Sequence, residues 1–328
     1  MAVNSNTQQT YGVTTIREDL QDAMISISPM DTPFMSAIGR KSVSNTYFEW
    51  PVVDLASPAA NRVVEGEASP GNDAPTNAVR LSNYTQISDK VVEVSDTADA
   101  VNGAADAQTL AKQVAYKLKE LKRDMELMLL SNIAASAGST SAARATAGLP
   151  AFLTSNVSRG SSGANGTLSG TTAGYPNAAA TDGTARALTE DMLKTVIASC
   201  WNNGAEPSIV LCGSAVKQKI SSTFTGSATK YQDMTATKTL SAAIDIYVSD
   251  FGTLQIVPSR FLETRTVAAR DVFVLDPNYA RVAYLSNVSQ KPLARTGHSE
   301  RRLISTEYGL QVDTKKAHGI IADINGAL

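Results

Sequence analysis

The longest helical pattern in the chain spans residues 106–136. Apolar residues recur there at gaps of three and four, namely Leu110, Val114, Leu118, Leu121, Met125 and Met128. This spacing predicts a helix with one buried face, and charged residues such as Arg123 and Glu126 are assigned to its other faces. Asp106 is a candidate N-cap, and Gly138 lies just past the last turn. Such a helix would be about 45 Å long, which is longer than a compact domain needs, so we expect it to be a spine for other layers.

Two strand patterns precede this helix. Residues 47–55 favour a strand, and residues 79–94 alternate apolar and polar side chains over much of their length. The stretch between them, 56–78, is rich in Pro, Gly, Asn and Asp, so the three segments together predict a long hairpin. A two-stranded hairpin is marginal in water by itself, and we therefore expect it to lie on another molecule.

The first 46 residues predict an arm with little core of its own. Residues 1–15 are polar, and a short helical pattern follows until Pro29 and Pro33 end it. Such an arm must be ordered either by the body of the protein or by a neighbouring molecule.

After the long helix, residues 148–157 favour a strand, and residues 158–184, rich in Gly, Ser, Ala and Thr, favour a loop. Low charge in this loop leaves it able to be ordered by contacts. Residues 188–224 predict a helix, a strand and a second helix. Thr189 is the expected N-cap, Gly204 the end of the first helix, and the expected buried stripe is Met192, Leu193, Val196, Ile197, Cys200 and Trp201. From residue 240 onward, five strand patterns follow, each bounded by Gly, Pro, Asn or Asp.

Composition narrows the function. The chain has 328 residues, 43% of them hydrophobic, and a formal charge of −2 from 29 basic and 31 acidic residues. A sizeable core is possible, and the charge argues against a protein that grips nucleic acid or a membrane surface electrostatically. No apolar run approaches the roughly 20 residues that span a bilayer, and the N-terminus lacks a signal pattern, so we expect a cytoplasmic protein that does not enter a membrane.

A search for catalytic chemistry finds little. The only histidines, His298 and His318, have no nucleophile or carboxylate partner at motif spacing, so a solvated or packed role is favoured. The only cysteines, Cys200 and Cys212, are expected to be small buried hydrophobes. No phosphate-binding loop or calcium loop is present, and we predict no enzyme, no cofactor and no metal.

Charged residues near the hairpin tip are the remaining candidates. Arg62, Glu65, Glu67 and Arg80 are either a solvated loop or inter-subunit ion pairs, and with Trp50 they form our hypothesis for subunit contacts. Exposed pairs contribute about 0–1 kcal/mol each, so they would matter through repetition across many interfaces. A structural protein that self-associates explains the arm, the hairpin, the long helix and the missing active site together.

The order of these parts resembles the tailed-bacteriophage major capsid family with the Hong-Kong-ninety-seven-type fold, an α+β fold. The resemblance extends over nearly the whole chain. Its segments include REDLQDAMISISPMDTPF at 17–34, NYTQISDKVVEVSDTADAV at 83–101, ELKRDMELMLL at 120–130, ATAGLPAFL at 145–153, ALTEDML at 187–193, YVSDFGTLQIVPSRFL at 247–262 and VFVLDPNYARVAYL at 272–285, followed by LARTGHSE and KAHGII.

The resemblance implies a division of the chain. Residues 1–46 would be the N-terminal arm and 47–94 the extended hairpin loop over a neighbouring subunit. Residues 95–187 and 289–328 would form the peripheral domain, which contains the spine helix 106–136, and 188–288 would form the axial domain around five- and six-fold axes. No cross-linking Lys–Asn pair is assigned.

The implied function is a major capsid protein that self-assembles, as pentamers and hexamers, into the icosahedral or elongated head shell of a tailed bacteriophage or prophage. It would be assembled in the host bacterial cytoplasm and reside in the virion capsid. Its partners would be its own copies, a separate scaffolding protein, a portal and a decoration protein, with weak non-specific contact to packaged DNA. The alternatives are an encapsulin-like compartment that encloses enzyme cargo and, with less support, a hydrolase on an α/β scaffold.

Overall fold

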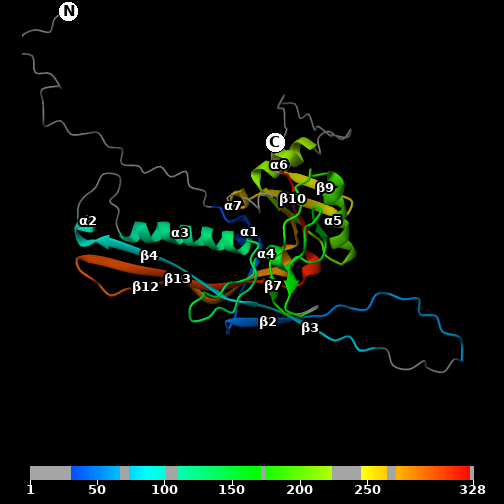
Figure 1. Ribbon diagram of the computed structural model, residues 1–328, viewed down its shortest axis with the longest axis horizontal. Coiled ribbons are helices and arrows are strands. Elements are labelled where there is room, and N and C mark those ends of the chain that lie inside the picture. Colours follow the sequence, from blue (N-terminus) through cyan, green and yellow to red (C-terminus); the bar gives the residue numbers. More distant parts are fainter. Residues whose placement is uncertain are drawn as a thin grey trace, which may run out of the picture.

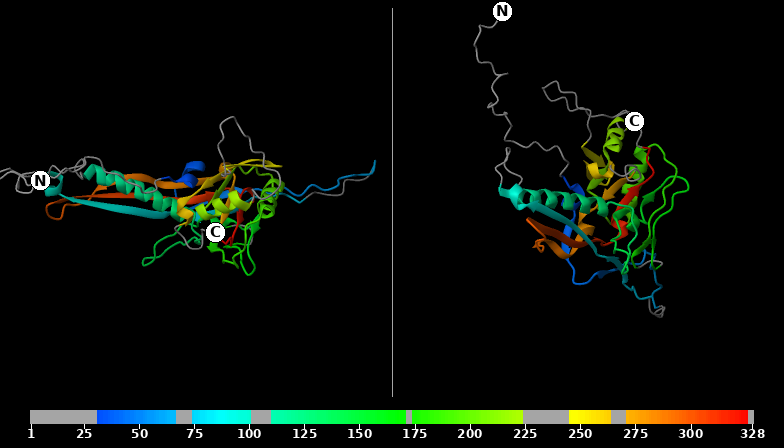
Figure 2. Two further views of the ribbon diagram at one scale, coloured as in Figure 1. Left: turned by 90° about the horizontal axis from the view of Figure 1, so that it is seen from above. Right: turned by 60° about the vertical axis from the view of Figure 1, so that its left-hand side comes forward.

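The computed structural model describes residues 31–66, 74–100, 110–170, 174–223, 245–263 and 271–325. The body is long and thin. A four-stranded sheet under a long helix forms one end, a six-stranded sheet with two helices forms the other, and a hairpin projects beyond the body (Figures 1 and 2). The predicted helix within residues 16–27 and the Asp106 cap lie outside the described residues.

The four-stranded sheet has the order β1-β12-β13-β4. Its strands are β1 (Gly39–Ser42), β12 (Ala280–Pro292), β13 (Ser299–Val312) and β4 (Gln86–Ser95). β1 is parallel to β12, and the other pairs are antiparallel. The helix α3 (Leu110–Leu129) lies along this sheet, where Val114 and Leu121 pack against Val92 and Ile304.

The buried stripe of α3 is confirmed at Val114, Leu121 and Met125, but the predicted end of the helix at residue 136 is wrong. Beyond Leu129 the Asn132 side chain holds the backbone of Ala180, donating to its oxygen at 2.7 Å and accepting from its nitrogen at 3.0 Å. These bonds hold the chain in a loop beyond the helix, whose 20 described residues span about 30 Å.

Glu126 is a second correction on α3. The sequence pattern assigned it to a polar face, but it is fully buried with 0% exposure. Its carboxylate contacts the backbone of α1 (Pro33–Ala37), the short helix that precedes β1.

The six-stranded sheet has the order β5-β14-β11-β8-β10-β9. Its strands are β5 (Val157–Ser158), β14 (Gly319–Ile321), β11 (Val272–Leu275), β8 (Ile209–Cys212), β10 (Gly252–Pro258) and β9 (Ile246–Ser249). The helices α5 (Glu190–Asn202) and α6 (Ser214–Thr223) share a core with it, which confirms the predicted helix–strand–helix unit. Thr189 caps α5 as expected, and Gly204 follows its end with a φ of +85°. The prediction that Trp201 is buried is wrong, because this residue is 50% exposed.

Residues 148–157 do not form the predicted strand. They begin with the short helix α4 (Leu149–Phe152) and reach β5 only at Val157. Gly148 has no room for a side chain, because a Cβ there would lie 1.8 Å from the carbonyl oxygen of Ser131. This close approach of two backbone segments positions α4 in the core, where its residues are buried.

The described parts of the loop after β5 are held by contacts, as its composition allowed. It contains the two-stranded sheet of β6 (Thr167–Leu168) and β7 (Pro176–Ala178). The buried carboxylate of Asp323 accepts the N–H groups of Gly160 at 2.9 Å and Gly183 at 2.8 Å, so it ties both ends of the loop to the C-terminal segment.

Strand pairing shifts the boundaries of the sequence-based division. β4, which the division placed in the hairpin loop 47–94, pairs with β13 in the four-stranded sheet. Within 188–288, β12 begins at Ala280 and belongs to the four-stranded sheet, whereas β14 from 289–328 pairs with β11 in the six-stranded one. Within 1–46, the end of the expected arm is part of the body, because Phe34, Met35 and Ile38 are buried in the main core.

The remaining described elements are short. They are β2 (Tyr47–Val52) and β3 (Val79–Tyr84) of the hairpin, the helices α2 (Asp96–Ala100) and α7 (Arg260–Glu263), and the 3-10 turns η4 (Pro277–Tyr279) and η5 (Lys315–Ala317).

Candidate assembly surfaces

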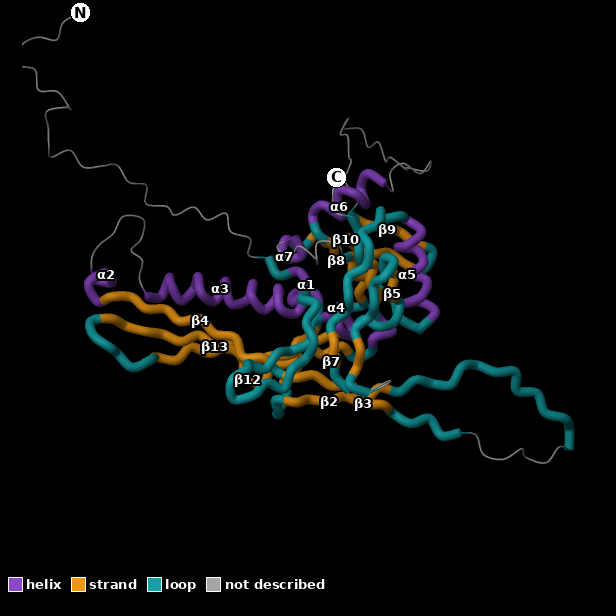
Figure 3. The backbone as a smooth tube through the Cα atoms, in the orientation of Figure 1, coloured by secondary structure: helices purple, strands orange, loops and turns teal. Residues whose placement is uncertain are grey.

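The hairpin is the first candidate surface. β2 and β3 pair antiparallel from Tyr47↔Tyr84 to Val52↔Val79, and beyond this pairing the described chain on both sides runs as loop away from the body (Figure 3). Four large aliphatic side chains are exposed there: Val53 by 54%, Leu55 by 84%, Val63 by 66% and Val64 by 75%. We call residues 53–66 the projecting loop. Its apolar side chains lie in water in the single subunit.

Trp50 anchors the base of this hairpin. It is only 4% exposed, and its indole Nε1 donates to the carbonyl oxygens of Val312 at 3.0 Å and Asp313 at 3.3 Å. Its ring stacks on Phe48 with centroids 5.7 Å apart and lies 6.2 Å from Phe152. The hypothesis that Trp50 contacts a neighbouring subunit is therefore corrected, since the tryptophan is buried within its own chain.

The charged residues proposed for subunit contacts lie in different parts of the hairpin. Arg62 and Glu65 are exposed on the projecting loop, and Glu67 lies outside the described residues. Arg80 lies at the base in β3, where it pairs with Glu49 of the same hairpin at 3.5 Å. Sequence reasoning missed Asp54, which pairs with Lys316 at 2.9 Å and fixes the start of the projecting loop to the body. No short-range pattern could have indicated a pair so distant in sequence.

The outer edge of the six-stranded sheet is a second candidate surface. β9 pairs only with β10 among the described strands, and its Ile246 and Val248 are 62% and 75% exposed. Tyr247, on the opposite face of the strand, donates from its hydroxyl to Glu190 of α5 at 3.1 Å. Trp201 and Phe251 form a further exposed aromatic pair with centroids 5.1 Å apart. An edge strand with exposed aliphatic side chains is typical of an interface.

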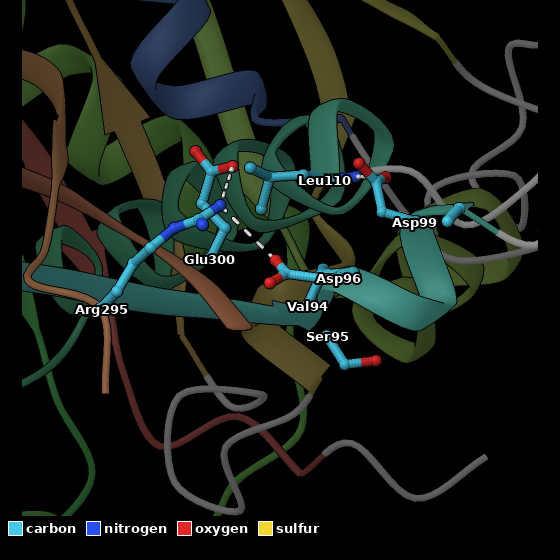
Figure 4. A pocket seen from close by; sticks show the side chains of 8 residues that line it. Val94, Ser95, Asp96, Asp99, Leu110, Arg295 and Glu300 are labelled. Carbon is cyan, nitrogen blue, oxygen red and sulfur yellow. Dashed lines mark hydrogen bonds and ion pairs between the residues drawn. The ribbon is translucent and has the colours of Figure 1, made fainter. Parts of the chain in front are cut away.

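The far tip of the four-stranded sheet contains a small polar pocket (Figure 4). Arg295 reaches between Asp96 at 3.5 Å and Glu300 at 3.7 Å, and Asp99 accepts the backbone N–H of Leu110 at 3.3 Å. These contacts join α2, the start of α3 and the β12–β13 hairpin. Arg295 is engaged by two carboxylates and Asp99 by a backbone N–H, so the clearest role of the pocket is to hold this tip together.

In the described part of the chain, no group of three His, Cys, Asp or Glu residues is placed to hold a metal ion. Cys200 and Cys212 are both buried, as predicted, and burial raises the pKa of Cys200 to about 12. His318 is buried, and burial lowers its pKa, so it packs as a neutral side chain that contacts the carbonyl oxygen of Tyr279 at 3.4 Å. Among the described helices, none has the length and apolar character needed to cross a membrane.

Three solved structures of low sequence identity share this fold. The capsid of a native GTA particle matches with a TM-score of 0.62 and 12% identity, covering 99% of this chain and 100% of that one. The structure titled Mycobacterium phage Adephagia matches with a TM-score of 0.64 and 10% identity over 97% and 98% of the two chains. The SrpI encapsulin of Synechococcus elongatus matches with a TM-score of 0.59 and 11% identity over 98% and 97%. The expected α+β capsid fold is thereby confirmed.

The family follows from the sequence match. The model of the SU10 major capsid protein matches residues 4–325, and the chain belongs to this family. The major capsid protein of Escherichia phage Phieco32 is 46% identical over 107 residues, which cover 32% of this chain and 30% of that protein. The matched segment thus spans less than a third of the curated relative.

Proposed function

We propose that this protein is the structural subunit of the head shell of a tailed bacteriophage or prophage, icosahedral or elongated, and that it has no enzymatic role. Membership of a major capsid family supports the proposal. The observation that carries it is the projecting loop, which extends beyond the body and exposes four large aliphatic side chains. A monomer leaves these side chains in water, whereas a neighbouring copy can cover them.

The exposed side chains of the projecting loop can stabilise a contact with a neighbouring subunit. Full burial of a Val or Leu side chain contributes about 1.5–3 kcal/mol. Because the four residues are 54–84% exposed, covering what remains exposed offers on the order of 4–8 kcal/mol in total before the cost of ordering the loop. Arg62 and Glu65 add exposed charges at the same place, each worth little alone. Repetition around closed rings of identical subunits turns these small terms into a stable shell.

The six-stranded sheet is the part that we expect to meet its copies around the five- and six-fold axes. Its edge strand β9 and the pair Trp201–Phe251 provide exposed apolar area for that contact. The formal charge of −2 suits a shell that encloses DNA with weak, non-specific contact. A separate scaffolding protein, a portal and a decoration protein complete the proposed partners, and assembly would occur in the host bacterial cytoplasm.

The second candidate is an encapsulin-like compartment, favoured by the fold similarity to the SrpI encapsulin. The two candidates differ in content, because a phage head encloses nucleic acid and a compartment encloses enzyme cargo. Nuclease-protected DNA in shells recovered from lysogenic or infected cells would support the head. Shells that contain a stoichiometric protein cargo and no DNA would support the compartment.

The test of self-assembly is negative-stain electron microscopy beside sedimentation velocity on the full-length protein expressed alone. Shells, tubes or ring capsomers are the expected result. If the protein alone stays a small species, it should assemble once a phage scaffold is supplied. A variant that lacks residues 56–78 should fold, with unchanged far-UV circular dichroism, but fail to assemble. Normal shells from this variant would refute the role of the loop, and a full-length protein that stays small even with scaffold would refute the shell.

A further inference from the structure

The exposed side of α3 carries a row of basic side chains. Its members fall within about 100° of the helix circumference and are Lys112, Lys119, Lys122 and Arg123. They extend over roughly 16 Å along the helix axis. Lys119 and Lys122 are exposed, and no carboxylate of the described residues pairs with either of them. The guanidinium of Arg123 lies over the ring of Phe261, 5.9 Å from its centroid, and keeps its charge there. We call these four residues the basic row.

The carboxylates of α3 do not neutralise this row. Glu120 pairs with Lys117 at 2.8 Å. Asp124 pairs with Lys90 of β4 at 2.6 Å, and Glu126 is buried, where it accepts two N–H groups of α1. The exposed side of the helix therefore has a surplus of positive charge, although the whole chain has a formal charge of −2.

α3 covers one face of the four-stranded sheet (Figure 1). Val92 of β4 and Ile304 of β13 pack against the helix. Successive residues of a strand point to opposite faces, so the paired residues Val91 and Leu303 point away from α3. Lys291 of β12 pairs with Leu303 and is exposed on that far face. It is thus a lysine on the side of the sheet opposite the basic row.

The far face has no such surplus of positive charge among the described residues of β4, β12 and β13. Arg301 pairs there with Glu93 at 3.3 Å, and the exposed carboxylate of Asp89 offsets the charge of Lys291. Val91, which is 44% exposed, adds apolar area. The two faces of this end of the body are therefore unlike: one is basic, and the other is close to neutral and partly apolar.

We infer that the α3 side of this end of the body faces the interior of the shell, where the basic row contacts the phosphate groups of packaged DNA. The inference rests on the proposed function, since a compartment for enzyme cargo holds no DNA. A DNA duplex carries one negative charge per about 1.7 Å of its axis, so a row of roughly 16 Å meets several phosphates. Lysine is a point charge on a flexible stem and accepts a phosphate of any base sequence. A few contacts in each subunit bind DNA weakly, and repetition over the inner surface of the shell adds them up.

The first test is the salt dependence of DNA binding by the unassembled full-length protein. Fluorescence anisotropy with a labelled duplex measures the association constant between about 50 and about 200 mM salt, a range in which each phosphate contact contributes about 0.9 to the slope of log K against log salt. The variant K119Q/K122Q keeps good helix formers and should lower the slope by about 1.8, so the wild type should lose about tenfold more affinity across this range than the variant. Lys291→Gln is the matched control on the opposite face and should keep the wild-type slope.

The second test locates the row in the assembled shell. Reductive methylation with formaldehyde, a small reagent, is followed by mass spectrometry in DNA-filled shells and in shells emptied of DNA. Lys119 and Lys122 should react several-fold more slowly in the filled shells, because DNA covers their amino groups. Lys291 should react at the same rate in both.

Three results would overturn the inference. The first is equal salt slopes in the wild type and K119Q/K122Q, which includes an absence of binding at the lowest salt. The second is equal methylation of Lys119 and Lys122 with and without DNA. The third is protection of these lysines in precursor shells that hold scaffold but no DNA, followed by exposure in filled heads, which would assign the row to the scaffold. None of these results touches the proposed function, which fails if the full-length protein forms no shell even with scaffold supplied.

Discussion

Replacing Trp50 tests whether this residue anchors the hairpin within its own subunit or contacts a neighbouring subunit. The side chain is buried among Phe48 and Phe152, and its Nε1 donates to the carbonyl oxygen of Val312. Trp50→Ala removes the whole ring from the core and should lower the free energy of unfolding by about 3–5 kcal/mol. Trp50→Phe keeps most of the packing but leaves a buried carbonyl without its donor, which should cost about 1–3 kcal/mol.

The assay is urea unfolding of the unassembled subunit, followed by far-UV circular dichroism. Fluorescence is unsuitable by itself, because Trp50 and Trp201 are the only tryptophans and one of them is removed. Arg62→Ala is the matched control on the same hairpin, since its exposed side chain should change stability by less than about 0.5 kcal/mol. If Trp50→Ala were as stable as the wild type and yet failed to assemble, Trp50 would be a subunit contact and the anchoring role would be refuted.

Two further predictions concern a pair of glycines and the buried carboxylate of Asp323. Gly148→Ala should destabilise the subunit by about 3 kcal/mol in urea unfolding, because its Cβ would strike the backbone of Ser131. Gly204→Ala should cost only about 1 kcal/mol, because its Cβ meets open space and only the positive φ is strained. Equal losses of stability in the two variants would contradict this account. Asp323→Asn should cost about 1–3 kcal/mol and raise hydrogen exchange in the loop 158–184, because one of the two glycine N–H groups loses its acceptor while Asn still tolerates the φ of +62°. Unchanged exchange in this loop would show that other contacts order it.

Local patterns predicted much of the secondary structure. The apolar stripe of α3 and the cap of α5 at Thr189 depend on residues a few positions apart, and both are confirmed. The hairpin was predicted because two strand patterns flank a turn-rich stretch, yet the alternation of residues 79–94 runs on from β3 into β4. Which partner each strand chooses is a long-range property, and so the sequence could not show that β4 leaves the hairpin for β13.

The corrected residues share one physical reason. Glu126, Trp50 and Trp201 were assigned from residue type and spacing, but their burial depends on segments far away in the sequence. Glu126 is covered by α1, more than 90 positions earlier, and Trp50 by the backbone at Val312, 262 positions later. The only information available in the sequence about Glu126 was its charge and its place on an amphipathic helix. Both predicted an exposed side chain, which is wrong.

The strand order also determines when the subunit can finish folding. β14, at residues 319–321, lies between β5 and β11 inside the six-stranded sheet. Its partner β5 precedes it in the chain by some 160 residues. The four-stranded sheet likewise joins β1 to β12, which follows it by about 240 residues. Pairings this distant make folding slow and leave neither sheet complete on a nascent chain. A ribosome must therefore synthesise nearly all of the 328 residues before the body closes, which delays association between unfinished neighbours on one polysome.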